Sequence, residues 1–181
     1  MAGFDLESLS HLVDHEVQPY QFEPIIASGG RSSQSTSVLQ EVQERKGRKD
    51  QAVSSWCQCG KCCTMDTDLE SLCCREVDKA AQFLTENGCI IEHDFFPQFC
   101  LNKWTLHFCS GFHKKILSSP SDYSNDNDRY RYTAYRNFVY AVWNRLPRNK
   151  RKVIPSCVVM AIRRAYPDLS EKYTGFQIVT E

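Results

Sequence analysis

The chain contains 181 residues, of which 41% are hydrophobic and 24% charged, and its 22 basic residues balance its 22 acidic residues. This composition excludes a wholly disordered protein and is typical of one sizeable globular domain. The sequence has no apolar run of about 18 residues, and its opening, Met1–His15, is acidic. We therefore expect neither a membrane-spanning helix nor a secretory signal, and predict a protein of the cytosol or nucleus.

The balance of charge conceals a division along the chain. Residues 1–50 contain 5 basic and 8 acidic side chains (net −3), and residues 51–100 contain 3 and 8 (net −5). Residues 101–181 contain 14 and 6 (net +8). Either the two halves pack together or the basic half meets an anion.

Residues 1–50 predict a disordered or weakly structured segment, ahead of a domain that covers residues 51–181. Residues 27–37 are rich in serine and glycine, which bury little apolar surface. Residues 40–50 are strongly charged, and we interpret them as a linker in preference to a short solvated helix.

Four helices are predicted in the domain from the spacing of apolar residues. The first covers residues 68–87 and ends at Asn87-Gly88; the second covers residues 103–117 and is followed by a polar loop. The third has an apolar stripe from Tyr132 to Leu146 and is stopped by Pro147. The last covers residues 156–166, with either Ser156 as its cap or Pro155 in its first turn.

Clustered cysteines are the strongest chemical signal in the sequence. Seven of the ten lie close together, namely Cys57, Cys59, Cys62, Cys63, Cys73, Cys74 and Cys89. In a reducing compartment such a cluster indicates metal binding more often than disulfides. The two-residue gap between Cys59 and Cys62 is the usual spacing of a zinc knuckle. Adjacent residues on a helix point about 100° apart, so Cys73 and Cys74 suit two neighbouring ions better than one.

Other interpretations of the cluster compete with structural zinc. Core packing is less favoured because several thiols occur at knuckle spacing; we assign that role only to Cys109 and Cys63. The spacing matches no familiar iron–sulfur pattern, and no acid or base is evident for catalytic zinc. His93 is a further candidate ligand, and whether Cys100 joins the metal shell stays open.

Six short motifs follow one another in a distinctive order between Trp56 and Phe176. They are Trp56-Cys57-x-Cys59-Gly60-x-Cys62, Leu72-Cys73-Cys74-Arg75, Tyr132-Thr133-Ala134-Tyr135-Arg136, Ile154-Pro155-Ser156-Cys157, Ile162-Arg163-Arg164-x-Tyr166-Pro167 and Tyr173-Thr174-Gly175-Phe176. This series resembles the cytosolic C-terminal ballast domain of the P2X purinoceptor 7 family. The two membrane helices and the ATP-binding head of the receptor are missing, so we expect a free-standing relative.

The resemblance implies an α+β fold dominated by helices, a cluster of two zinc ions and a site for a guanine nucleotide, GDP or GTP. The implied zinc ligands come from Cys59, Cys62, Cys73, Cys74, Cys89 and Cys157, with Cys57 close by. The implied nucleotide contacts are Arg131, Tyr132, Tyr135, Thr174 and Gly175. Two positions depart from the receptor: Tyr132 stands where it has histidine, and Asp168 where it has lysine.

We therefore predict a non-enzymatic, zinc-stabilised module that binds a guanine nucleotide and serves as an interaction platform for a protein partner. An enzyme is disfavoured because its candidate nucleophiles, the thiols, are assigned to metal. The alternative is a nucleic-acid-binding zinc protein that uses a basic patch of Arg145, Arg148, Lys150, Arg151, Lys152, Arg163 and Arg164. The run from Arg148 to Lys152 also matches a nuclear import signal.

Overall fold

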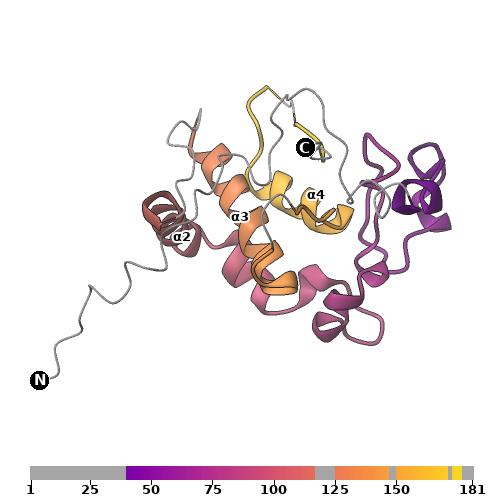
Figure 1. Ribbon diagram of the computed structural model, residues 1–181, viewed down its shortest axis with the longest axis horizontal. Coiled ribbons are helices and arrows are strands. Elements are labelled where there is room, and N and C mark those ends of the chain that lie inside the picture. Colours follow the sequence, from indigo (N-terminus) through magenta and orange to yellow (C-terminus); the bar gives the residue numbers. More distant parts are fainter. Residues whose placement is uncertain (1–39, 117–124, 147–149, 171–172, 177–181) are drawn as a thin grey trace, which may run out of the picture.

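A computed structural model describes residues 40–116, 125–146, 150–170 and 173–176, and these residues form a mainly helical fold (Figure 1). Three α-helices, α2 (Lys103–Ile116), α3 (Asp126–Trp143) and α4 (Ser156–Ala165), follow a region of short 3-10 turns. The prediction of a mainly helical fold is confirmed. Its β component is wrong for these ranges, which contain no strand.

Residues 40–50 pack against the domain instead of forming the predicted linker. Residues 40–44 are helical and are followed by the 3-10 helix η2 (Arg48–Asp50). The buried guanidinium of Arg45 donates a 2.8 Å hydrogen bond to the carbonyl of Leu69. The carboxylate of Asp68 accepts the backbone N–H groups of Gly47 and Lys49, both at 2.9 Å. Residues 1–39 of the predicted weakly structured segment lie outside the described residues.

The predicted helix over residues 68–87 is wrong in type, although its apolar positions are largely correct. The region forms two 3-10 helices, η4 (Cys74–Glu76) and η5 (Asp78–Phe83), separated by the extended residue Val77. Leu72 cannot continue an α-helix because its carbonyl accepts the backbone N–H of Ser156 at 2.9 Å. A 3-10 helix has three residues per turn, so it repeats apolar residues at nearly the spacing that predicted an α-helix.

The second predicted helix is confirmed as α2. It follows the 3-10 helix η6 (Ile90–Glu92) and a single π-helical turn, η7 (Pro97–Leu101). The side chain of Asn102 caps α2 by accepting the N–H groups of Trp104 at 2.9 Å and Thr105 at 3.2 Å.

The third and fourth predicted helices are confirmed with shifted ends. Asn125 caps α3 by accepting the N–H of Asp128 at 3.0 Å, and α3 ends at Asn144, whose φ of 59° is left-handed, before Pro147 is reached. Helix α4 begins at Ser156, as the predicted range does, but Pro155 is the cap, so neither predicted role, Ser156 as the cap or Pro155 in the first turn, is correct.

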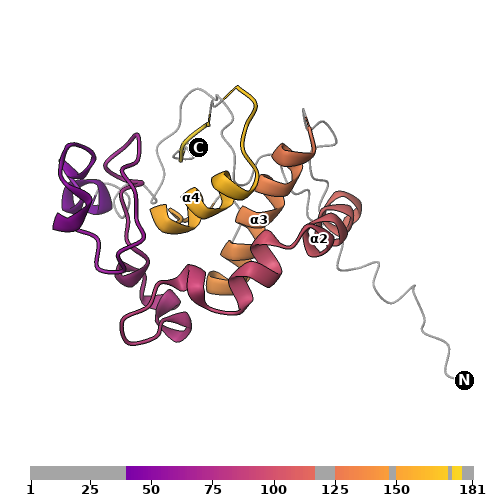
Figure 2. The same ribbon diagram turned by 180° about the vertical axis from the view of Figure 1, so that it is seen from behind.

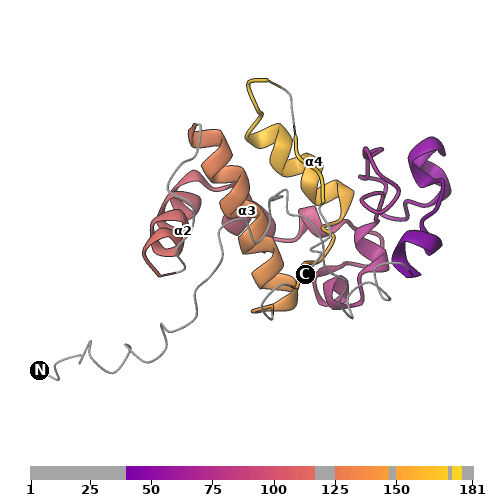
Figure 3. The same cartoon turned by 45° about the horizontal axis from the view of Figure 1, so that its top comes forward.

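Helix α3 lies between α2 and α4, and Figures 1, 2 and 3 agree on this order. The core between these elements includes the fully buried side chains of Phe96, Leu106, Phe138 and Ile162. Residues 40–60 lie beyond α4, at the opposite end of the molecule from α2 (Figures 1 and 2). The cysteines therefore gather on the α4 side of the core.

Candidate metal centre

Four thiols from one short stretch and one later turn form a first group. The Sγ atoms of Cys57, Cys59, Cys62 and Cys73 all lie within 4.8 Å of one another. The separation is 3.8 Å between Cys57 and Cys59 and 3.6 Å between Cys59 and Cys62. Gly60 lets the chain reverse between them, since its φ of 70° is left-handed and disfavours a side chain.

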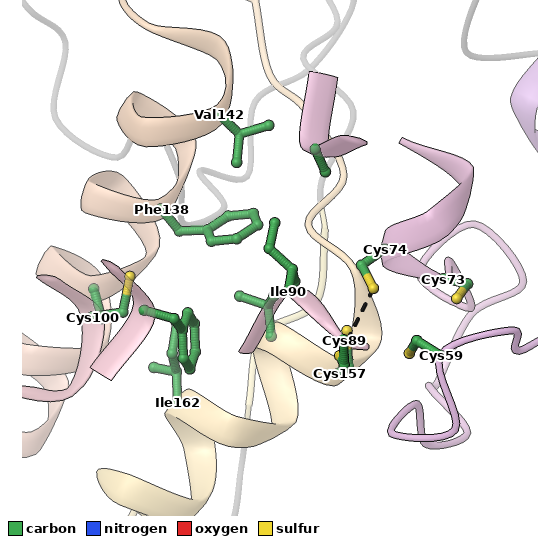
Figure 4. Packing of buried hydrophobic residues seen from close by; sticks show 14 of the residues in the cluster. Cys59, Cys73, Cys74, Cys89, Ile90, Cys100, Phe138, Val142, Cys157 and Ile162 are labelled. Atoms are coloured by element: carbon green, nitrogen blue, oxygen red, sulfur yellow. Dashed lines mark hydrogen bonds between the residues drawn. The ribbon is translucent and has the colours of Figure 1, made fainter. Parts of the chain in front are cut away.

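A second group is fully buried and draws on more distant parts of the chain. The Sγ atoms of Cys59, Cys74, Cys89 and Cys157 also lie within 4.8 Å of one another. Figure 4 shows these sulfurs converging, with the 3.8 Å contact between Cys74 and Cys89 marked. Cys157 reaches the group from the first turn of α4. Cys59 belongs to both groups, and the neighbours Cys73 and Cys74 fall into different ones.

These thiol sets fit zinc in geometry and in chemistry. Four sulfurs held tetrahedrally at about 2.3 Å from one ion lie about 3.8 Å from one another. The Sγ separations of 3.8 Å for Cys57 and Cys59, 3.6 Å for Cys59 and Cys62, and 3.8 Å for Cys74 and Cys89 match that edge. Each set offers four sulfurs, the ligand number of a closed structural site, and leaves no position for water.

Two glutamates fix the backbone beside the thiols in the same way. The N–H of Cys73 donates to the carboxylate of Glu76 at 2.8 Å, and the N–H of Cys89 donates to that of Glu92 at 2.8 Å. In both cases the cysteine caps a 3-10 turn in a reciprocal capping box. The signal that sequence reasoning missed is therefore a Cys-x-x-Glu pattern that occurs twice, each time at a grouped thiol.

Each of these glutamates also pairs with a basic residue. Arg48 donates two hydrogen bonds of 2.6 and 2.9 Å to Glu76, and this pair is partly shielded from solvent. Lys61 lies 3.3 Å from Glu92 in a more exposed pair. The hydrogen bond to Glu76 raises the pKa of Arg48. Residues 40–50 thus contribute to the surroundings of the first thiol group.

Hydrogen bonds between the buried thiols give them different pKa values. Hydrogen bonding with Cys157 lowers the pKa of Cys59 to about 5 and that of Cys89 to about 5, and the single S–H of Cys157 can serve only one of them at a time. The bond to Cys59, with those to the other thiols, raises the pKa of Cys157. These thiols share protons within one cluster, where a divalent cation can replace several protons together.

His93, a predicted ligand, lies outside both groups, as do Cys100, whose role the sequence leaves open, and Cys63. His93 is in neither group: its Nδ1 accepts the N–H of Phe95 at 3.2 Å, and its ring lies 5.3 Å from that of Phe83. Cys100 is buried in the apolar core, where burial raises its pKa, and Figure 4 shows it apart from the grouped sulfurs. Cys63, assigned above to core packing, is half-buried and accepts a hydrogen bond from Arg164 at 3.3 Å.

The predicted nucleotide contacts on α3 are engaged within the protein. Arg131 is buried, donates to the carbonyl of Tyr166 at 2.9 Å, and pairs with the carboxylates of Asp128 and of Asp168, the latter at 3.0 Å. Tyr132 is buried and its hydroxyl accepts a 3.1 Å hydrogen bond from Arg136. Tyr135 packs against the core.

The other predicted nucleotide contacts lie beside a carboxylate. The N–H of Phe176 donates to Glu70 at 2.9 Å, and a Cβ on Gly175 would come within 2.8 Å of the same carboxylate. Thr174 is exposed. The preceding residue, Tyr173, places its ring 5.4 Å from the Arg131 guanidinium, so the turn and Arg131 are neighbours. Glu70 lies beside Gly175 and Asp168 lies beside Arg131, so the predicted nucleotide contacts are next to two carboxylates.

Only some of the basic residues that would form the predicted nucleic-acid-binding patch are exposed. Arg145, Lys152 and Arg164 are exposed, whereas Lys150 and Arg151 are half-buried, and burial lowers the pKa of Arg151. The guanidinium of Arg163 lies 4.4 Å from the ring of Tyr173. Arg148 lies outside the described residues.

Comparison with known proteins identifies the family. The family model described as the P2X purinoreceptor 7 intracellular domain matches residues 8–177. The P2X purinoceptor 7 of Rattus norvegicus is 29% identical over 129 residues, which cover 67% of this chain and 20% of the receptor. That of Mus musculus is 28% identical over 155 residues, which cover 82% of this chain and 23% of the receptor.

The chain therefore spans about a fifth of the length of the curated relatives that it matches. Within the described residues, no helix is both long and apolar enough to cross a bilayer. The matched region includes all of the grouped thiols and all of the predicted nucleotide contacts. The chain belongs to the P2X purinoreceptor 7 intracellular domain family.

Proposed function

We propose that this protein is a non-catalytic module of the cytoplasm, held together by two zinc ions, that serves as a platform for a protein partner. The observation that carries the proposal is the convergence of seven thiols into two groups that share Cys59. The description of the family as an intracellular domain supports the location.

The two groups divide the ligands between the ions. Cys57, Cys62 and Cys73 would hold the first ion, and Cys74, Cys89 and Cys157 the second, with the thiolate of Cys59 bridging both. When bound, zinc supplies a cross-link and a countercharge for buried thiolates, and it carries out no redox chemistry. Two full sets of four sulfurs leave no open coordination position, which is why we propose a structural role.

The second group would make metal binding part of the stability of the fold. Cys157 lies in the first turn of α4, and Cys74 and Cys89 belong to the 3-10 region, so one ion would join elements far apart in the chain. Structural zinc sites contribute apparent binding free energies of about 10–16 kcal/mol at neutral pH. That exceeds what hydrogen bonds between the same thiols contribute, since a typical one is worth about 1 kcal/mol.

The competing interpretation is that the thiols are small apolar side chains of the core. It fits Cys73, Cys74 and Cys157, which are almost inaccessible. It fits Cys57 and Cys62 poorly, because both are partly exposed while their sulfurs still converge on Cys59.

Elemental analysis of the full chain, purified untagged under reducing conditions, separates the two interpretations. We expect about two zinc ions per chain, the number that two four-thiol sites with one shared ligand bind. The Cys109→Ser variant is the control, because Cys109 belongs to neither group. Bound iron, or protein that folds cooperatively with no metal, contradicts the proposal.

Guanine-nucleotide binding remains a prediction from the family resemblance. Arg131 already faces Asp128 and Asp168, so a phosphate group would have to displace a carboxylate or share the guanidinium with it. We therefore propose that any binding of GDP or GTP is weak. Chromatography of small molecules released by acid from the same preparation tests this: abundant guanine nucleotide contradicts weak binding.

A further inference from the structure

Helix α2 carries aromatic side chains on the face that points away from the core. Trp104 is 84% exposed, Phe108 75% and Phe112 52%. These residues are spaced four apart, so they form one stripe along the helix. Leu106 on the other side of α2 is fully buried against the core. Each residue of the stripe is large and apolar, and such a contiguous exposed stripe marks an interaction site.

The charged side chains of α2 itself are all basic. Lys103 and His107 are exposed on α2, and Lys114 and Lys115 occur in its last turn. No acidic residue occurs from residue 95 to residue 121. A second copy of the chain would bring the same lysines together and repel, so the charge favours an anionic partner.

The shape of the stripe favours a deformable partner. It is a ridge on a single helix, and α2 lies at one end of the molecule with α3 behind it (Figures 1 and 3). Trp and Phe on one face with lysines beside them are typical of helices that lie in the interface of a bilayer. The acidic residues Glu41, Glu44 and Asp50 do not oppose such contact, because residues 40–60 lie at the other end (Figure 2).

We propose that this aromatic face of α2, defined by Trp104, Phe108 and Phe112, docks onto the surface of an anionic lipid bilayer. The aromatic rings enter the headgroup region and the lysines contact lipid phosphates, while α2 stays parallel to the surface. This inference does not rest on the zinc proposal, because the face shares no residue with the thiol groups.

The experiment mixes the full chain with vesicles of phosphatidylcholine alone or of phosphatidylcholine with phosphatidylserine. We expect cosedimentation with the mixed vesicles, weakened by added salt, and a shift of Trp104 fluorescence to shorter wavelength. Trp56 is buried and Trp143 packs half-buried against the core, so Trp104 is the tryptophan best placed to report binding, and the Trp104→Phe variant should bind with most of that shift lost. Zinc content is measured in the same samples, so that loss of metal is not mistaken for loss of docking.

Paired variants distinguish the face from general apolar exposure. Phe108→Ser combined with Phe112→Ser should weaken vesicle binding at least about tenfold, because both rings lose their burial in lipid. Tyr140→Ser combined with Leu169→Ser is the control, since these residues are 66% and 88% exposed but lie outside α2. The control should bind as the unchanged chain does.

Four outcomes overturn the proposal. One is no binding to either kind of vesicle by zinc-loaded protein, and another is equal binding by the two paired variants. A third is a Trp104 emission that is already at short wavelength without vesicles and that changes when residues 1–39 are removed. That result would show that the chain's own acidic opening covers the face. The last is a Trp104 emission that changes with protein concentration, which would show that the face binds a second copy of the chain.

Discussion

The backbone N–H of Ser156 donates a 2.9 Å hydrogen bond to the carbonyl of Leu72, which joins the start of α4 to the residue before the paired cysteines. This bond puts Cys157 beside Cys74 and interrupts the helix expected over residues 68–87. One contact therefore accounts both for a thiol that local spacing could not nominate and for an error in the predicted secondary structure.

Replacing the thiol that completes the second group should remove one ion. In Cys157→Ser we expect about one zinc per chain, because the first group keeps all four of its sulfurs. Elemental analysis of purified protein gives the number, and amide hydrogen exchange should show faster exchange in α4. Retention of two zinc ions would contradict the assignment of Cys157.

Replacing the shared thiol should have the larger effect. Cys59→Ser removes a ligand from both groups, so we expect a loss of both ions and a decrease of at least about 3 kcal/mol in the free energy of unfolding. Zinc analysis with denaturant unfolding measures both quantities. Cys109→Ser is the matched control, and a Cys59→Ser protein with a single firmly bound zinc would show that Cys59 does not bridge.

The glutamate beside Cys73 should tune the affinity for metal. Glu76→Gln weakens the pair with Arg48 and the bond from the Cys73 N–H, so zinc affinity should decrease about tenfold. Competition with a chromogenic chelator measures the change. Glu86→Gln makes the same substitution at an exposed site and should leave the affinity unchanged; equal effects in both variants would point to net charge alone.

Reversing one charge near Arg131 should strengthen binding of guanine nucleotides. Asp168→Lys removes a carboxylate that lies 3.0 Å from the guanidinium and adds a cation, which favours a phosphate by Coulomb attraction. Titration with a fluorescent GTP analogue should show at least about tenfold tighter binding. Asp126→Lys makes the same change near the exposed start of α3, and similar gains in both variants would indicate nonspecific attraction.

The sequence was most informative where one face of a helix is buried. Tyr132, Val139 and Val142 of the predicted apolar stripe are buried, which is why α3 was predicted as a helix, although it begins at Asp126 and ends at Trp143, three residues before the end of the stripe at Leu146. The last helix was predicted to within one residue of the bounds of α4. The spacing of Cys59 and Cys62 likewise indicated a shared site, since both sulfurs belong to the first group.

Features that depend on long-range partners could not be predicted from local pattern. Residues 40–50 read as a linker because nothing nearby in the sequence shows that Arg45 reaches Leu69 or that Asp68 accepts two backbone N–H groups. His93 has the residue type of a ligand, but its ring packs with Phe83 and Phe95. The residue type of His93 suggested a metal ligand, but its packing places the ring away from the thiols.

The division of ligands also sets an order in time. All thiols of the first group lie between Cys57 and Cys73, whereas the second group waits for Cys157, 84 residues later. At the usual pace of synthesis, about 5–20 residues per second, this interval is roughly 4–17 seconds. On the proposed assignment, the nascent chain can bind the first ion during this interval, while Cys74 and Cys89 lack their partner Cys157 and stay open to oxidation until α4 is made.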